Sequence, residues 1–230
     1  MKTNLRMIKE MTKTMARTVV PENTDIEGII IHPFLSSSLW INETHQVIDL
    51  IEKDNYDIWL EQFDKVIDNC NLPLVYMQWR DPWKLTFMKF CGEYLSEKDY
   101  AEYLADAWVS EENPNMDSNV SRKEAIKMFK SCKKQYLMTE SDYDYFKHLP
   151  YEVELYRGVS RGRIKLGLSW TDDKEKAIWF MNRWKSSFNC LLKVKAQKKD
   201  IIAYFDTRNE KECLLDVFKY QNKIKEVRKL

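Results

Sequence analysis

The sequence predicts an α+β fold, in which a mainly helical N-terminal region, residues 1–149, precedes a β-rich module, residues 150–230. The spacing of apolar residues changes at Pro150, from a helical period to short β-branched and aromatic runs. The composition, 44% hydrophobic and 13% aromatic in 230 residues, suits a chain with a real core and not a disordered one. The β module is expected to be largely antiparallel, either alone or as one compact unit with part of the helical region.

The helical prediction rests on capping signals as well as on periodicity. In "SRKEAIKMFK", Ser121 is an N-cap residue and Glu124 completes a capping box before the apolar stripe. A short apolar run near residue 30, ended by Pro33, is the one early segment that favours a strand. Helices are expected over residues 1–20, 96–108, 121–130 and 141–149.

After Pro150, six short runs rich in β-branched and aromatic residues predict strands. They cover residues 153–159, 166–170, 191–196, 201–205, 213–218 and 223–230. One helix interrupts them, within "TDDKEKAIWFMNRW", and Thr171 or Asp172 is expected to cap it. Its apolar face is expected to comprise Ala177, Phe180, Met181 and Trp184.

Charge is distributed unevenly along the chain. Residues 151–230 contain 19 Lys and Arg against 11 Asp and Glu, a net charge of +8, whereas residues 1–150 contain 18 against 25, a net charge of −7. A basic module attracts anions such as phosphate groups. The basic residues are spread through the module and form no nucleic-acid-binding motif, so a nucleic acid is not the expected ligand.

Residue types also restrict the class of protein. The five cysteines form no CxxC pair and the three histidines stand in no ligand spacing, which argues against a disulfide framework and a metal centre. No apolar run is long enough to span a bilayer, and the N-terminus lacks the apolar core of a secretory signal. These features predict a reduced, cytoplasmic protein with no membrane partner and no metal.

Polar residues at the ends of predicted segments form candidate binding positions. Arg157 ends the first strand of the module, where its guanidinium fork suits a diphosphate, and Gly158 allows a ligand close to the backbone. Ser169 and Thr171 flank Trp170 where a strand leads into the helix, and their hydroxyls can bond a ligand or orient a carboxylate. Each signal is weak alone, because a salt-bridged arginine or a helix cap has the same sequence.

Glu210 and Glu212 form the third candidate position, in "RNEKECLLD". Side chains two apart on an extended chain point to the same side, so both carboxylates are expected to face one substrate. Two neighbouring acids with separate roles suit glycosyl chemistry. Taken alone, a Glu-x-Glu pair is more often a solvated strand edge.

In this order, "YRG", "SWT" and "EKE" resemble the arginine–serine–glutamate class of ADP-ribosyltransferases. The stretch from about residue 150 to 220 looks like the small bacterial and prophage-encoded members of that superfamily. The resemblance implies an ADP-ribosyltransferase-like antiparallel module with NAD as its substrate. It also implies that Glu212 bonds the ribose 2′-hydroxyl and that Glu210 orients or deprotonates the acceptor.

The resemblance assigns the remaining candidates to the cofactor. Arg157 would hold the phosphates, and the backbone of Gly158 would bind the carboxamide. Ser169 would brace the catalytic carboxylate, with Thr171 beside it. The middle motif here is Ser-Trp-Thr, whereas many members have Ser-Thr-Ser, so Trp170 must fit a crowded position.

The expected activity is mono-ADP-ribosylation of a protein side chain. Arginine is the expected acceptor, because members with glutamate at both positions of the pair usually modify a guanidinium. An NAD glycohydrolase, with water as acceptor, would use the same site. The alternative from a different class is a catalytically silent scaffold that binds and inhibits a protein partner. The sequence does not identify the acceptor protein.

Overall fold

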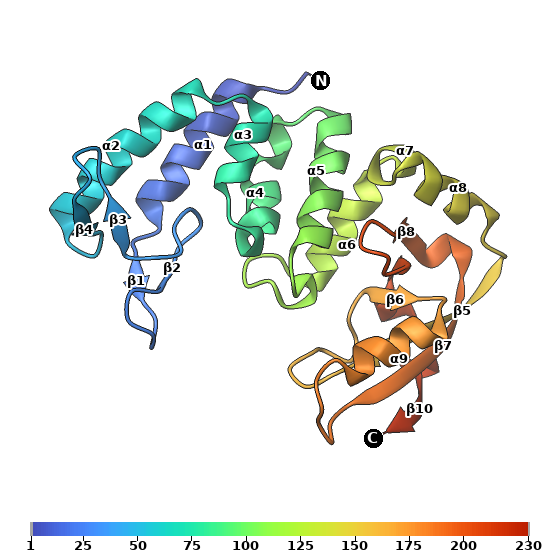
Figure 1. The fold of residues 1–230 in the computed structure, drawn as a ribbon. Helices are drawn as coiled ribbons and strands as arrows, with labels where there is room; N and C mark the ends of the chain where they lie inside the picture. The colour runs from blue at the N-terminus through green and yellow to red at the C-terminus, as the bar shows by residue number, and fades with distance from the viewer. Residues whose placement is uncertain (1, 230) are drawn as a thin grey trace. The chain divides into compact units, whose positions relative to one another are not determined.

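The computed structural model describes residues 2–229, and the chain divides into two compact units, Met1–Ser96 and Glu97–Leu230 (Figure 1). This division lies earlier in the chain than the predicted boundary at 149/150. The helices after Glu97 pack with the sheet that follows them, which is the alternative that the sequence left open. The β module therefore forms one unit with part of the helical region. Within residues 2–229, every helix is too short or too polar to cross a bilayer.

The first unit is a helical assembly with two small hairpins. Its helices are α1 (Leu5–Thr18), α2 (Lys53–Asn69), α3 (Leu72–Gln78) and α4 (Lys84–Cys91), with 3-10 turns at Asp81–Trp83 and Gly92–Tyr94. The hairpins pair β1 (Glu22–Asn23) with β2 (Ile30–Ile31) and β3 (Leu39–Ile41) with β4 (Val47–Asp49). Tyr56, Trp59 and Phe63 stack along α2, with ring centroids 5.3 and 4.9 Å apart, and form its core. The predicted early strand is only two residues long, and β1, β3 and β4 were too short to give a periodic signal.

Four helices open the second unit. They are α5 (Glu97–Ser110), α6 (Arg122–Ser131), α7 (Lys134–Leu137) and α8 (Glu140–His148), with a 3-10 turn at Pro114–Met116. The predicted cap of α6 is present, since the Ser121 hydroxyl accepts a hydrogen bond of 3.2 Å from the amide of Glu124. Thr139 caps α8 and not a residue at the predicted start, 141. Helices α6, α7 and α8 contact β8 (Ile201–Phe205), which lies at one edge of the sheet.

A six-stranded antiparallel sheet fills the rest of the second unit. Its order is β10-β7-β5-β6-β9-β8, with β5 at Glu152–Val159, β6 at Ser169–Thr171, β7 at Cys190–Gln197, β9 at Glu212–Leu215 and β10 at Lys225–Lys229. The predicted strands 166–170 and 213–218 are shorter than expected, and Val217–Lys219 forms a 3-10 turn instead, as do Lys198–Asp200 and Gln221–Lys223. The last residue of the predicted strand 223–230 lies outside the described residues. The sheet confirms the α+β class.

Strand β5 is paired differently on its two sides. On one side it pairs with β7 from Glu152 to Val159, along its whole length. On the other it pairs with β6 only where Tyr156 lies opposite Thr171. Beyond Tyr156 this side of β5 has no described strand partner, so its end is open to the space beside β6.

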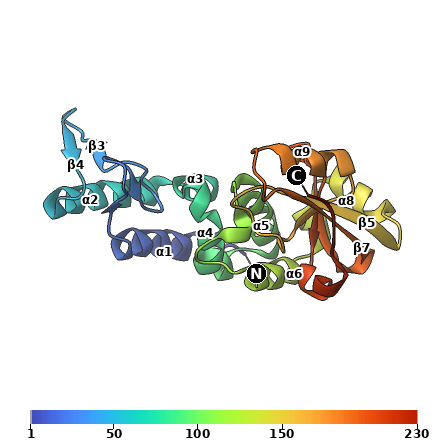
Figure 2. The ribbon, with the colours of Figure 1, turned by 90° about the horizontal axis from the view of Figure 1, so that it is seen from below.

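Helix α9 (Lys174–Asn182) packs on β5, β6 and β7 (Figure 2). Asp173 is its N-cap and accepts from the amides of the two residues at its first turn, Glu175 and Lys176. The expected cap was wrong because Thr171 belongs to β6, and its hydroxyl accepts from the Asp173 amide.

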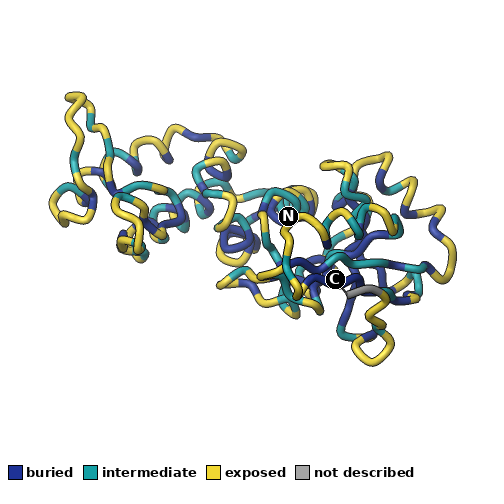
Figure 3. The backbone as a smooth tube through the Cα atoms, turned by 60° about the horizontal axis from the view of Figure 1, so that its bottom comes forward, coloured by how far each residue is buried: buried dark blue, intermediate teal, exposed yellow. Residues whose placement is uncertain are grey.

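The apolar face of α9 is narrower than the sequence predicts. Ala177 and Met181 are fully buried, whereas Phe180 is only partly buried. Trp184 lies beyond the end of the helix and is 59% exposed. Figure 3 colours each residue by its burial, and the buried stretches of this unit lie in its interior.

A glycine sets how closely α9 approaches the sheet. A Cβ atom on Gly158 would lie 1.9 Å from the Ala177 carbonyl oxygen and 2.5 Å from the Met181 amide nitrogen. Both are backbone atoms of the helix, so they cannot yield without moving α9. The glycine is thus required by helix–sheet packing, in addition to the ligand approach that the sequence suggested.

We expect Gly158→Ala to lower the free energy of unfolding of the second unit by about 3 kcal/mol or more, because the added carbon overlaps backbone. The matched control is Gly162→Ala. Gly162 has φ +79° and nothing within 4 Å of its Cβ position, so only conformational strain of about 1–2 kcal/mol applies. Urea denaturation of both variants checks this, and equal effects would contradict the packing argument.

Candidate functional site

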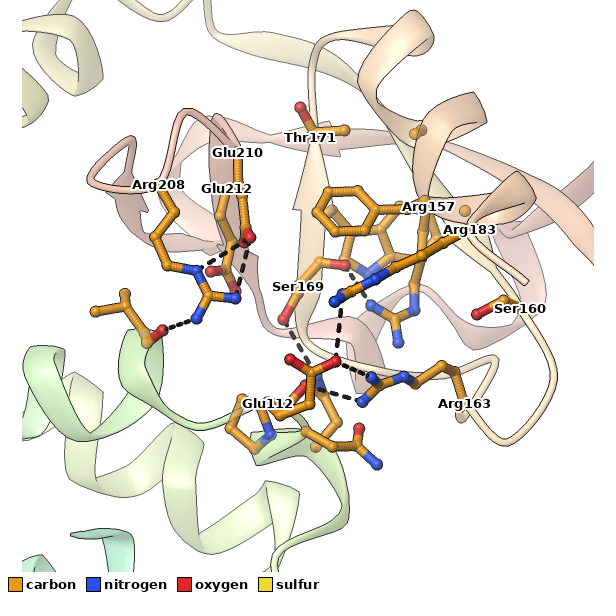
Figure 4. Close-up of a pocket in the computed structure, with 18 of the residues that line it drawn as sticks. Glu112, Arg157, Ser160, Arg163, Ser169, Thr171, Arg183, Arg208, Glu210 and Glu212 are labelled. Carbon is orange, nitrogen blue, oxygen red and sulfur yellow. Dashed lines mark hydrogen bonds and ion pairs between the residues drawn. The ribbon is translucent and has the colours of Figure 1, made fainter. Parts of the chain in front are cut away.

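All six residues singled out in the sequence line one cavity of the second unit (Figure 4). The cavity opens to solvent, and its empty volume of about 840 Å³ includes the solvent space at its opening. Its walls come from the end of α5, the loop that follows it, β5, β6, α9 and the turn before β9. The six residues are Arg157, Gly158, Ser169, Thr171, Glu210 and Glu212.

Glu212 is the best-held carboxylate of the cavity. It begins β9, and Trp108 of α5 donates its indole N–H to Glu212 Oε1 at 2.8 Å. Burial raises the pKa of Glu212, a hydrogen bond from Ser169 and the one from Trp108 lower it, and the charge of Glu210 raises it further. The net direction is upward. The contact between Ser169 and Glu212 is the one that the resemblance implies.

Ser169 is itself held in place by the loop after α5. Its hydroxyl accepts a hydrogen bond of 3.1 Å from the side-chain amide of Asn115. The Asn115 oxygen in turn accepts from the amide of Leu168 at 2.5 Å. Asn115 therefore bonds two consecutive residues, Leu168 and Ser169, and holds the serine hydroxyl in place.

Glu210 reaches the cavity by a tight turn and not by an extended strand. The residues on either side of it, Asn209 and Lys211, have φ of 54° and 49°, in the left-handed region. The predicted extended geometry is therefore wrong, although both glutamates do line the same cavity. Glu210 Oε1 lies 3.1 Å from Nε and from Nη2 of Arg208.

Arg157 lies in the cavity wall with its guanidinium bonded to backbone. Nη1 donates to the Ser169 carbonyl at 2.6 Å and Nη2 to the Ile164 carbonyl at 3.0 Å, while Nε has no partner among the described residues. Burial lowers the pKa of Arg157 to about 10, and the charge of Glu212 opposes that shift. A Cβ on Gly167 would lie 2.3 Å from Nη2, so the glycine makes room for the arginine. This geometry favours a positioning role for Arg157 over direct phosphate binding.

Two arginines outside the predicted set line the cavity, and both are paired with Glu112. Arg163 Nη2 and Arg183 Nη1 lie 2.7 and 3.2 Å from the same oxygen of Glu112. Arg163 Nη1 also donates to the Glu112 carbonyl at 2.8 Å. The carboxylate is largely exposed, so it holds two guanidinium groups together at the surface of the cavity (Figure 4).

Glu111 is a buried acid in the cavity wall. Its Oε2 has no hydrogen-bond partner among residues 2–229, and its side chain is nearly fully buried. Burial, with a smaller contribution from the charge of Asp117, raises the pKa of Glu111 to about 8. At neutral pH its carboxyl group is therefore mainly protonated.

Sequence reasoning missed the part of the site that comes from the helical region and the loops. Trp108 was visible only as an apolar position of a helix, and Arg208 only as a flank of the Glu-x-Glu pair. The residues missed are Trp108, Glu111, Glu112, Asn115, Arg163, Arg183 and Arg208. Within the described residues, no three His, Cys, Asp or Glu side chains gather in a way that could hold a metal ion.

Glu111→Gln should change how stability depends on pH. Because the pKa of Glu111 is raised in the folded state, the folded chain binds more protons than the unfolded chain between roughly pH 4.5 and 8, and stability falls as pH rises through that window. The variant should lose this fall. The difference in stability between the variant and the wild type should therefore shift in favour of the variant when the pH is raised from about 6 to about 9.

Calorimetric Tm values at the two pH values measure the effect. Glu175→Gln, at an exposed glutamate outside the cavity, is the matched control and should follow the wild type. If Glu111→Gln also followed the wild type at both pH values, the buried protonated carboxyl would be ruled out.

Comparison with protein-family models, with curated proteins and with solved structures finds no match to this chain. The chemistry of the site is therefore argued from its own residues. They are a held carboxylate, a second carboxylate beside it, and three arginines at the mouth of the cavity.

Proposed function

We propose that this protein is an NAD-dependent mono-ADP-ribosyltransferase that modifies a protein side chain, with arginine as acceptor. The observation that carries the proposal is the arrangement around Glu212. Its carboxylate is held by Trp108 and Ser169 in a cavity that also contains Glu210 and the guanidinium of Arg157. A solvated strand edge needs no such support.

The held carboxylate suits the cleavage of an N-glycosidic bond. As nicotinamide leaves NAD, positive charge develops on the ribose ring, and a fixed negative charge nearby stabilises it. Glu212 is fixed by two hydrogen bonds before any substrate binds, so little reorganisation is needed in the reaction. Ser169 and Trp108 both favour its charged form, which the reaction requires.

The second carboxylate suits the acceptor. Glu210 lies in the turn that precedes β9 and already contacts a guanidinium, that of Arg208. The same carboxylate could orient an acceptor arginine and take its proton. This supports arginine as the acceptor over water, because a water molecule does not need a carboxylate placed to bind a guanidinium.

The diphosphate requires a separate group of donors. Both terminal nitrogens of Arg157 already donate hydrogen bonds to backbone carbonyls. We therefore assign the phosphates to Arg163 and Arg183. Planar guanidinium groups bind phosphate oxygens in pairs. The Glu112 carboxylate that now lies between them stands where an anionic group would bind.

Incubation of the protein with labelled NAD and cell lysate separates the three activities considered. A labelled acceptor protein supports the transferase. Release of nicotinamide without a labelled protein would indicate a glycohydrolase. Neither product would indicate a scaffold that binds a partner without chemistry.

We expect Glu212→Gln and Glu210→Gln to behave differently. Loss of the charge at Glu212 should slow every reaction of NAD, by a hundredfold or more, corresponding to about 3–4 kcal/mol of transition-state stabilisation. Loss of the charge at Glu210 should abolish transfer to arginine but leave slow release of nicotinamide to water. Nicotinamide release and protein labelling are measured separately in each variant.

Glu175→Gln is the matched control for both substitutions, since Glu175 is exposed in the first turn of α9 and does not line the cavity. All variants are first checked for folding by circular dichroism. Full activity in Glu212→Gln would refute the assignment of the catalytic carboxylate. Equal losses in both variants would refute the separate roles.

Substitutions at the mouth of the cavity test the phosphate assignment. Arg183→Gln should weaken NAD binding about tenfold or more, because a charge-assisted hydrogen bond contributes on the order of 1.5–3 kcal/mol. Glu112→Gln should strengthen binding, because the competing charge is removed. Arg161→Gln, at an exposed arginine outside the cavity, should have no effect. Titration calorimetry measures the three, and unchanged affinity in Arg183→Gln would contradict the assignment.

A further inference from the structure

Arg208 presents a guanidinium group inside the cavity that contains the two glutamates. Its Nε and Nη2 both lie 3.1 Å from Glu210 Oε1, and its Nη1 donates to the Val109 carbonyl at 2.6 Å (Figure 4). The side chain is 41% exposed, so the group is held but not buried. All three nitrogens of the guanidinium are thus engaged at the mouth of the cavity.

The turn that carries Arg208 is itself held in one conformation. Asn209 and Lys211 take left-handed backbone angles, and the Lys211 amide donates to Asp206 Oδ1 at 3.0 Å. The Lys211 ammonium lies 3.0 Å from the carboxylate of Asp173, the N-cap of α9. These two contacts of Lys211 hold the turn on the C-terminal side of Glu210, and the ion pair with Glu210 holds Arg208 on the other side.

We propose that Arg208 is a self-modification site, onto which the protein transfers ADP-ribose from NAD. This inference rests on the proposed function and names its first acceptor. The guanidinium already lies against Glu210, the carboxylate that we assign to the acceptor. Their contact is partly exposed to solvent, and such ion pairs are weak, so the guanidinium can turn one nitrogen toward the ribose while it stays within reach of Glu210.

The transfer balances without any further reactant. The bond between nicotinamide N1 and ribose C1′ breaks, and its electron pair leaves with neutral nicotinamide. A nitrogen of the Arg208 guanidinium gives a proton to Glu210, and its lone pair forms the new bond to C1′. The products are ADP-ribosyl-Arg208, nicotinamide and one proton, which Glu210 releases to solvent. No electrons are gained or lost.

The inference is tested with the full chain and NAD alone, with no other protein present. Peptide mass spectrometry should locate ADP-ribose on Arg208 of the wild type. Arg208→Lys should lower self-labelling at least tenfold, whereas Arg161→Lys, at an exposed arginine outside the cavity, should label as the wild type does. The rate of labelling per chain should not change on tenfold dilution, because donor site and acceptor share one cavity.

Agmatine, a small free guanidine, separates this inference from the function on which it rests. Modification of agmatine with no label on Arg208 of the wild type would overturn self-modification and leave the transferase in place. No nicotinamide release and no modified agmatine would overturn both. A labelling rate that falls on dilution would overturn transfer within one chain. Because the label is mapped on the wild type, the test does not depend on the folding of a variant.

Discussion

The burial of the Arg157 guanidinium is the constraint on which the rest of the site depends. A buried charge is costly unless hydrogen bonds and an opposite charge compensate it. Here the carbonyls of Ser169 and Ile164 and the charge of Glu212 supply part of that compensation, while Nε has no partner among the described residues. Because Ser169 belongs to β6, the same hydrogen bond keeps β6 beside the end of β5. Ser169 then offers its hydroxyl to Glu212, so the position of the carboxylate is linked to that of the buried charge.

Local signals in the sequence were sufficient wherever an element has a marked end or a clear period. Ser121 caps α6 as predicted, and each of the six runs after Pro150 overlaps an observed strand. The three motifs meet because β5, β6 and β9 are neighbours in the sheet, and Thr171 lies opposite both Tyr156 and Glu212. The resemblance carried by the three motifs implied one shared site, and the six residues line one cavity, but it named none of the helical residues that complete it.

The remaining features depend on contacts that no local pattern records. Trp108 is 104 positions from Glu212 in sequence, so its indole contact arises only when α5 packs with the sheet. The same packing moved the boundary between the two units to residue 96. The left-handed conformation of Lys211 has no signal in the sequence either, since non-glycine residues adopt it only where surrounding contacts require it. It is this turn that directs Arg208 and Glu210 into the cavity.

The arginines at the mouth of the cavity are already paired, and this decides how an anionic substrate could bind. Arg163 and Arg183 share the Glu112 carboxylate, and Arg208 holds Glu210. Each of these pairs is at least partly exposed to solvent, and exposed pairs stabilise a protein by no more than about 1 kcal/mol. A diphosphate would offer the guanidinium groups a doubly charged partner with more acceptor oxygens than the Glu112 carboxylate has, so the proposed substrate would compete with Glu112 for them. Substrate binding would therefore exchange the carboxylate partner of these arginines for a phosphate. The arginines would be paired both before and after the substrate binds. The displaced Glu112 carboxylate, being largely exposed, would return to water at little cost.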